Sequence, residues 1–177
     1  MWIHNGRQQL PGDDKGSMTI QNFTVIDDFL DDPYSHLDDI FNNDFSDIET
    51  EVGVFKNIQN RADDIVSQKI MHFLPGVEMV YNFARLSPVN QEEPTYIHSD
   101  DVMGDITCLL YLNRDFPNEN GTTIYDDDKE KKAVQFFGKF NRMIIFDAKL
   151  FHSRNIFSNF GVGKDSRLVQ VIFLKIK

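Results

Sequence analysis

Short apolar runs separated by turn residues fill the chain after Gly76, and this pattern constrains the fold more than any other feature of the sequence. Such runs predict β-strands, and six of them within about 100 residues indicate a sandwich or jelly roll. The runs are Glu78–Phe83, Ile106–Leu112, Thr122–Tyr125, Ala133–Phe137, Met143–Phe146 and Leu168–Ile176. Strands do not alternate with helices and no glycine-rich phosphate loop is present, so the sequence disfavours a nucleotide-binding α/β fold.

The chain before Gly76 predicts a strand and two helices. Phe23–Ile26 has the composition of a short strand, and Asp32 followed by Pro33 predicts the start of a helix that continues to about Asn42. A second helix is predicted by apolar residues at helical spacing, namely Ala62, Val66, Ile70 and Phe73. We expect residues 1–17, which are polar and glycine-rich, to form a mobile segment, and residues 18–177 to form one mainly β domain.

Charge and cysteine content limit the partners and the compartment. The 177 residues include 28 acidic and 18 basic side chains, which gives a net charge of −10. This balance argues against a groove that binds nucleic acid or an anionic membrane surface. Cys108 is the single cysteine, so no intrachain disulfide can form, and no apolar run has the length of a signal-peptide core or a membrane span. We therefore expect a cytoplasmic protein.

Two His-x-Asp triplets are candidate metal sites, and their predicted local structures separate them. His36 and Asp38 lie in a predicted helix, where residues two apart point roughly 200° away from each other and cannot bind one ion. His98 and Asp100 precede a predicted strand, and in extended chain residues two apart share a face. His98 and Asp100 can therefore bind one metal ion together.

His152 is the candidate third ligand, because it is the one histidine that follows in the predicted β region. Two imidazoles and one carboxylate on one face leave coordination positions open, as in non-haem Fe(II) oxygenases. The alternative is that both histidines are surface residues in loops. Asp101 would replace Asp100 as a ligand only if the strand register shifted by one residue.

Arg167 and Tyr111 are candidates for binding an anionic co-substrate. Arg167 begins an apolar strand, from which its guanidinium could point into the interior and bind the carboxylate of a dicarboxylic acid. Strand alternation places Leu109 and Tyr111 on one face, where an apolar wall ends in a hydroxyl group, and Cys108 on the opposite face. We interpret Cys108 as a small buried apolar residue and not as a nucleophile.

Four segments in order resemble the prolyl 4-hydroxylase-like branch of the Fe(II)/2-oxoglutarate-dependent oxygenases. They are HSDDVMGDITCLLYLNRD from His98 to Asp115, Asn120-Gly121-Thr122, Phe146 to His152, and Arg167 to Phe173, and the opening Val25 to Pro33 is also typical of such chains. The resemblance covers about residues 23–177. It implies a double-stranded β-helix with N-terminal helices packed on one sheet.

The same resemblance implies the site and the reaction. His98, Asp100 and His152 would bind Fe(II), Arg167 would bind the distal carboxylate of 2-oxoglutarate, and Tyr111 would assist it, with Leu109 beside it on the strand face described above. With dioxygen, such a site hydroxylates an unactivated C–H bond. Two departures from the family pattern are Asn120, where a glycine is common, and a long spacing between His152 and Arg167, which leaves Lys164 as a rival anchor.

The substrate is the least determined part of the prediction. Tyr81 and Arg85 share a strand face that leads toward the expected site, and the segment Ser87–Tyr96 could act as a lid. The candidate substrates are a prolyl residue in a peptide, a free amino acid or another small molecule, neutral or basic rather than acidic. Two other classes of protein stay open: a non-catalytic β-sandwich binding module with an incidental or structural metal, and a cupin-like metal enzyme that needs no co-substrate.

Overall fold

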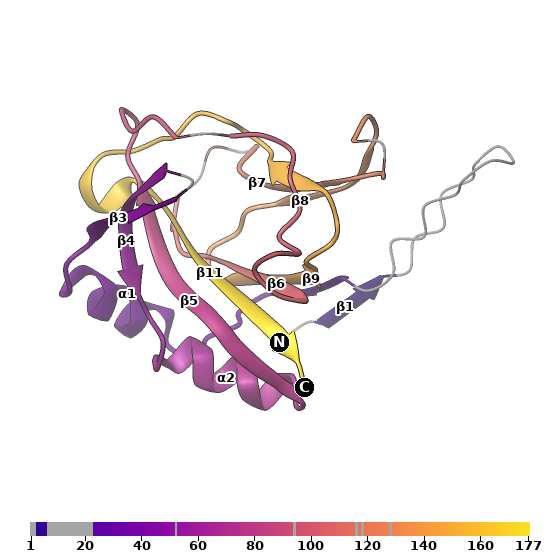
Figure 1. Cartoon of the computed structure of the whole chain (residues 1–177). Helices are drawn as coiled ribbons and strands as arrows, with labels where there is room; N and C mark the ends of the chain where they lie inside the picture. The colour runs from indigo at the N-terminus through magenta and orange to yellow at the C-terminus, as the bar shows by residue number, and fades with distance from the viewer. Residues whose placement is uncertain are drawn as a thin grey trace, which may run out of the picture.

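The strands form two antiparallel sheets (Figure 1) in the computed structural model, which describes residues 3–6, 23–51, 53–93, 95–115, 117, 119–127 and 129–177. The larger sheet has eight strands in the order β1-β2-β9-β6-β11-β5-β4-β3, and the smaller has three in the order β10-β7-β8. This mostly β, antiparallel arrangement is consistent with a jelly roll. The strands are β1 Ile3–Gly6, β2 Phe23–Ile26, β3 Ser46–Thr50, β4 Gly53–Asn60, β5 Val77–Ser87, β6 Ile106–Tyr111, β7 Gly121–Tyr125, β8 Lys132–Phe137, β9 Arg142–Asp147, β10 His152–Arg154 and β11 Arg167–Ile176.

Two short helices lie between the early strands, and an aspartate caps the N-terminus of each. Helix α1 spans Pro33–Phe41, and the Asp32 carboxylate accepts a hydrogen bond from the backbone N–H of Ser35. Helix α2 spans Ile65–Phe73, and Asp64 accepts in the same way from Ser67. Both side chains satisfy N–H groups that have no partner within the helix. A single 3-10 turn, Gly163–Asp165, precedes β11.

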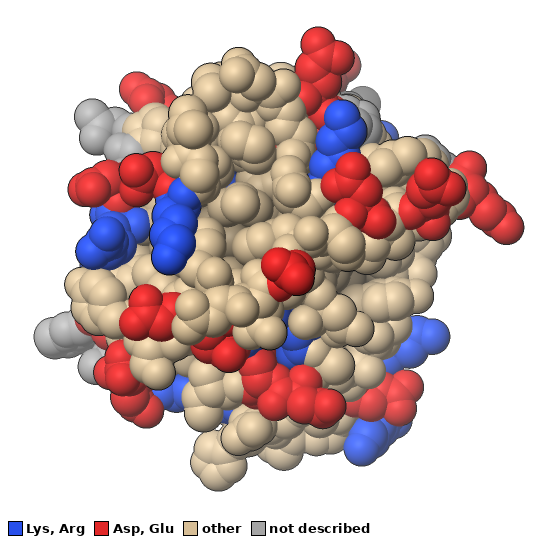
Figure 2. All heavy atoms as spheres, turned by 90° about the vertical axis from the view of Figure 1, so that its left-hand side faces the viewer, with Lys and Arg blue, Asp and Glu red and all other residues tan. Residues whose placement is uncertain are grey.

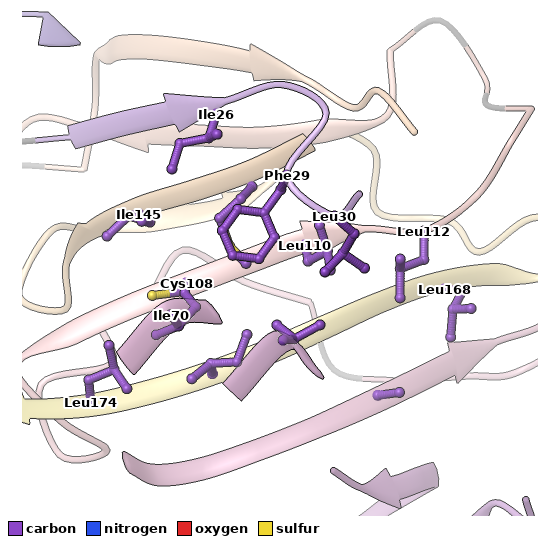
Figure 3. Packing of buried hydrophobic residues seen from close by; sticks show 14 of the residues in the cluster. Ile26, Phe29, Leu30, Ile70, Cys108, Leu110, Leu112, Ile145, Leu168 and Leu174 are labelled. Carbon is purple, nitrogen blue, oxygen red and sulfur yellow. The ribbon is translucent and has the colours of Figure 1, made fainter. Parts of the chain in front are cut away.

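The larger sheet buries a different apolar cluster on each of its two faces. One cluster includes residues of both helices and alternate residues of the central strands, and Figure 3 shows part of it; its members include Ile40, Val66, Ile70, Cys108, Leu110, Leu168 and Ile172. The other joins the two sheets and includes Tyr111, Ile124, Phe136, Ile144, Phe146 and Val169. The second cluster defines the interior of the jelly roll. The predicted alternation of Cys108 and Leu110 against Leu109 and Tyr111 is confirmed.

All six strands predicted after Gly76 are present, and the structure adds others. The β3–β4 hairpin falls between the two helices, and β10 is a three-residue strand. Ile3–Gly6, within the segment expected to be mobile, pairs with β2 at the edge of the larger sheet, and residues 7–22 lie outside the described residues. An unpaired strand edge offers backbone donors and acceptors, which explains how a polar segment can add a strand there.

Gly121 carries the left-handed conformation at the start of β7. Its φ is 146°, and an added Cβ would lie 2.0 Å from the carbonyl oxygen of Phe136. The preceding Asn120, which stands where a glycine is common in the family, has no positive φ. The glycine requirement therefore falls at Gly121, the first residue of β7, which is the strand that pairs with β10. In the described part of the chain, no helix is long and apolar enough to cross a membrane.

Candidate metal centre

Backbone hydrogen bonds bring the three predicted ligands together. His98 forms an isolated antiparallel bridge with His152, the first residue of β10, with N–O distances of 3.0 and 2.8 Å. The backbone N–H of Asp100 donates to the carbonyl oxygen of Ala148 at 2.8 Å. The segment that contains His98 and Asp100 is thus extended and lies beside the smaller sheet, as the two-residue spacing of the ligands requires.

The ligand atoms of His98, Asp100 and His152 all lie within 4.8 Å of one another. The Nε2 atoms of the two histidines are 3.5 and 3.2 Å from the two oxygens of the Asp100 carboxylate. Within the described ranges, this is the group of histidine, cysteine and acidic side chains that converges closely enough for one ion. Three protein ligands on one side leave further coordination positions open for small molecules.

Hydrogen bonds to the other ring nitrogens orient the two imidazoles. Nδ1 of His98 is 3.0 Å from the carbonyl oxygen of Tyr96, and Nδ1 of His152 is 2.9 Å from that of Leu150. A carbonyl oxygen only accepts, so both Nδ1 atoms donate a proton there, and both Nε2 atoms face the Asp100 carboxylate, where each would bind a metal in place of a proton. Such contacts orient metal-binding histidines and strengthen them as ligands. These contacts could not be predicted from the sequence, because every residue has a backbone carbonyl.

The Asp100 carboxylate is buried, oriented and ionised. Thr107, on the interior face of β6, donates to it at 3.0 Å. Burial alone raises the pKa of Asp100, but the contacts with His152, His98 and Thr107 lower it more, so its pKa lies below the usual value. The His152 side chain is 7% exposed and the His98 side chain 40% exposed. The centre is therefore accessible from the His98 side.

Arg167 is a buried cation that forms no ion pair among the described residues. It begins β11, two residues before the interior residue Val169, and is 7% exposed. Its Nε atom has no hydrogen-bond partner there. Burial, followed by the nearby charge of Arg154, lowers the pKa of Arg167 to about 10. A guanidinium held in the interior in this way is suited to bind an anion.

Tyr111 lies near Arg167 in the same interior. Its hydroxyl group is 2.5 Å from the hydroxyl of Thr122 on β7, and burial raises its pKa. Leu109 packs against the interior cluster on the same strand face. The rival anchor Lys164 is placed differently, because its Nζ lies over the ring of Phe41 on α1, 5.2 Å from the ring centroid. Lys164 therefore points toward the helix and not toward Tyr111.

The two residues predicted to lead to the site differ in exposure. Tyr81 is 51% exposed, whereas Arg85 forms an ion pair of 2.7 Å with the buried Glu93. Glu93 belongs to the segment expected to act as a lid, in which Pro94 lies outside the described residues. Sequence reasoning missed Glu93 and also Arg154, although Arg154 lies two residues after His152 and so on the same strand face.

His36, which the helical argument excluded as a ligand, lies elsewhere. It is buried on α1, and its Nε2 is 2.8 Å from the side-chain oxygen of Gln170 on β11. Gln170 points to the helix side of the larger sheet, since its neighbours Leu168 and Ile172 belong to the cluster there. His36 is thus separated from the interior by the sheet.

Two antiparallel sheets around a His-Asp-His group define a jelly roll with a candidate metal centre. No protein-family model and no curated protein matches the chain. Among solved structures, the alpha-ketoglutarate-dependent epimerase SnoN from nogalamycin biosynthesis is similar, with a TM-score of 0.58 and 12% identity over 86% of this chain and 76% of that one. EctD from S. alaskensis is similar in its apoform, with a TM-score of 0.58 and 13% identity over 97% and 84% of the chains.

A further EctD structure, with 2-oxoglutarate and 5-hydroxyectoine, has a TM-score of 0.57 and 16% identity over 88% of this chain and 72% of that one. At such identities the likeness establishes a shared fold. The jelly-roll architecture predicted from the strand pattern is consistent with it.

Proposed function

We propose that the protein is an Fe(II)- and 2-oxoglutarate-dependent dioxygenase that hydroxylates an unactivated C–H bond. The observation that carries the proposal is the pairing of two features in one interior: the His98-Asp100-His152 group, and the buried, unpaired guanidinium of Arg167. The solved structures of similar fold include enzymes described with iron and with 2-oxoglutarate, which supports the assignment. The domain would be a double-stranded β-helix with its N-terminal helices on one sheet.

The residues present fit both the metal and the co-substrate. Nε2 of His98, Nε2 of His152 and the Asp100 carboxylate would bind Fe(II), and Arg167 with Tyr111 would bind the distal carboxylate of 2-oxoglutarate. When bound, the iron and 2-oxoglutarate supply the activation of dioxygen. Thr107 and the two backbone carbonyls hold the metal ligands in orientation. The apolar cluster around Ile144 and Phe146 excludes water from the same interior.

Net charge and cysteine content bear on the substrate class and the compartment. Candidate substrates are a free amino acid, another small molecule or a prolyl residue in a peptide, as in the prolyl 4-hydroxylase-like branch. The net charge of −10 supports a neutral or basic molecule, and Figure 2 shows acidic side chains dispersed over one face of the protein. The same charge argues against nucleic acid and anionic membranes as partners, and the lack of a disulfide agrees with a cytoplasmic protein.

Metal and co-substrate binding can be tested without a known substrate. Anaerobic addition of Fe(II) and 2-oxoglutarate should give a weak visible charge-transfer band, and air should then allow slow formation of succinate. Asp100→Ala should abolish both signals, whereas Asp101→Ala, an exposed neighbour with no part in the group, should retain them. Succinate formation by Asp100→Ala at the wild-type rate would refute the metal site.

The same assay decides between the rival anchors and the rival classes. Arg167→Ala should lose affinity for 2-oxoglutarate, and Lys164→Ala should not. A wild-type protein that binds Fe(II) but gives neither the band nor succinate would instead be a cupin-like enzyme or a binding module.

A further inference from the structure

Three arginine side chains converge on the Arg167 end of the interior. Arg154 is the cross-strand partner of Thr122, whose hydroxyl contacts Tyr111, and Arg85 is the cross-strand partner of Val169. Directly paired residues of neighbouring strands project from the same face. Arg154 and Arg85 therefore share the interior face with Arg167, and the nearby charge of Arg154 is one cause, after burial, of the lowered pKa of Arg167.

Hydrogen bonds from its two terminal nitrogens hold the guanidinium of Arg154 in place. Both terminal nitrogens donate to the side-chain oxygen of Asn159 at 3.0 Å, and Nη2 also donates to the carbonyl oxygen of Phe157 at 2.6 Å. Asn159 is itself fixed, because its Nδ2 donates to Glu93 at 2.9 Å and to the backbone of Gln91 at 2.7 Å. These contacts leave the Nε–H of Arg154 buried and without a partner among the described residues.

The group formed by the three arginines and Glu93 carries more positive than negative charge. Glu93, with its side chain 5% exposed, is 2.7 Å from Arg85 and 3.4 Å from Arg154, and it is the one carboxylate that these ion pairs include. One carboxylate beside three guanidinium groups leaves a positive excess in a largely buried region, which is costly unless an anion binds. The Nε–H groups of Arg85, Arg154 and Arg167 are all buried without a hydrogen-bond partner among the described residues, and an anion beside Arg154 and Arg167 would satisfy the donors of these two.

We propose that Arg154 is a second binding residue for the distal carboxylate of 2-oxoglutarate, beside Arg167, and that Asn159 positions it. The inference rests on the proposed function. A carboxylate has two oxygens that can accept from two guanidinium groups, so one ligand group can satisfy both donors. Glu93 lies closer to Arg85 than to Arg154, at 2.7 against 3.4 Å, and it meets Arg154 at Nη1, so the Nε–H of Arg154 stays available beside Arg167.

The test measures binding without turnover. Calorimetric titration of the Zn(II)-loaded protein with 2-oxoglutarate is compared with titration by 2-oxobutyrate, which has the same metal-binding end but no distal carboxylate. Arg154→Gln should lower the affinity for 2-oxoglutarate on the order of tenfold or more, which is the usual effect of losing a hydrogen bond between charged groups. Its affinities for 2-oxobutyrate and for Zn(II) should not change.

Two further variants sharpen the result. Arg114→Gln makes the same substitution at an exposed position and should bind both ligands as the wild type does. Asn159→Ala should reduce the preference for 2-oxoglutarate over 2-oxobutyrate by a smaller factor than Arg154→Gln. General loosening of the fold would lower the affinity for both ligands alike. It would therefore not produce a selective loss of the preference for 2-oxoglutarate over 2-oxobutyrate.

Three outcomes would overturn the inference. An unchanged 2-oxoglutarate affinity in Arg154→Gln would show that Arg154 does not contact the co-substrate. Equal weakening of both ligands would make Arg154 a structural residue. Failure of the wild-type protein to bind 2-oxoglutarate at all would instead refute the proposed function, and the Arg154 variant is not needed to observe it.

Discussion

Asp27 illustrates how a single side chain can link distant parts of this chain. Its carboxylate accepts from Nε and Nη2 of Arg142 at 2.6 and 3.0 Å, and from Lys139 at 3.0 Å. The hydrogen bond from Arg142 is the main reason that the pKa of Asp27 is lowered to about 2. The turn after β2 is thereby tied to the start of β9.

This pairing predicts a pH-dependent contribution to stability. Because the pKa of Asp27 is lower in the folded than in the unfolded chain, its contribution is complete above about pH 4 and is lost as the pH falls toward 2. We expect Asp27→Asn to reduce the free energy of unfolding by about 1 kcal/mol at pH 7, a value discounted for partial exposure. Urea unfolding at several pH values should show this difference shrinking below pH 4. A difference independent of pH would contradict the ionic origin.

Cys108 gives a second prediction at this scale. It is fully buried between the larger sheet and the helices, and burial raises the pKa of its thiol. Since the thiolate is the reactive form, we expect no reaction with a chromogenic disulfide reagent in the native protein and one equivalent of reaction after unfolding. Rapid labelling of the native protein, at the rate of a free thiol, would show that the cluster opens.

At the scale of elements, helices and strands with local sequence signals could be predicted, and those that depend on pairing with distant strands could not. The start of α1 after Asp32 and the existence of α2 were predictable because capping and apolar spacing are local. The start of α2 was predicted too early, because Ala62, the first residue of the apolar spacing, lies in the turn before the Asp64 cap. The β3–β4 hairpin was not, because most of its side chains are exposed and it extends the sheet through pairing of Ile58 with Arg85. Strand β5 likewise continues to Ser87, four residues beyond the predicted end, where it pairs with β11.

The start of α2 carries the prediction at this scale. Asp64 caps the helix and also accepts hydrogen bonds from Arg61, Asn82 and Gln170, with its side chain 6% exposed. Asp64→Ala removes the cap and leaves these donors unpaired, so we expect it to lower the free energy of unfolding by about 3 kcal/mol or more. The exposed neighbour provides the control, since Asp63→Ala should change stability by no more than about 0.5 kcal/mol. Similar losses in both variants would refute the role of the network.

At the scale of the whole molecule, the site was predictable only in part. The convergence of His98, Asp100 and His152 followed from two-residue spacing and strand order. Arg154, Glu93 and Asn159 could not be found that way, because their contacts depend on how two loops and two sheets come together. Arg154 has one local signal, its position two residues after His152, and that signal has meaning only once β10 is known to be a strand.

Net charge gives a prediction for the molecule as a whole. A charge of −10 on a chain of this size repels itself in the compact state. Salt screens charges separated by more than about 8 Å at 0.15 M ionic strength, so it should relieve this repulsion more than it weakens close ion pairs. We expect the free energy of unfolding at neutral pH to rise as sodium chloride increases from low concentration to 0.15 M. Urea titrations at fixed pH would measure it, and a fall would mean that close ion pairs dominate.

The His98–His152 bridge joins the segment before β6 to the smaller sheet by two backbone hydrogen bonds and no continuous strand. An ion held by both histidines would act there as a reversible cross-link between distant points of the chain. It would close the chain between His98 and His152 into a loop. Because such an ion binds the folded chain and dissociates from the unfolded one, it stabilises the fold by its own binding free energy. Besides its part in the proposed reaction, the metal would thus stabilise the junction between the His98 segment and the smaller sheet. Removing it with a chelator should open the His98 segment to proteases before the rest of the fold is lost.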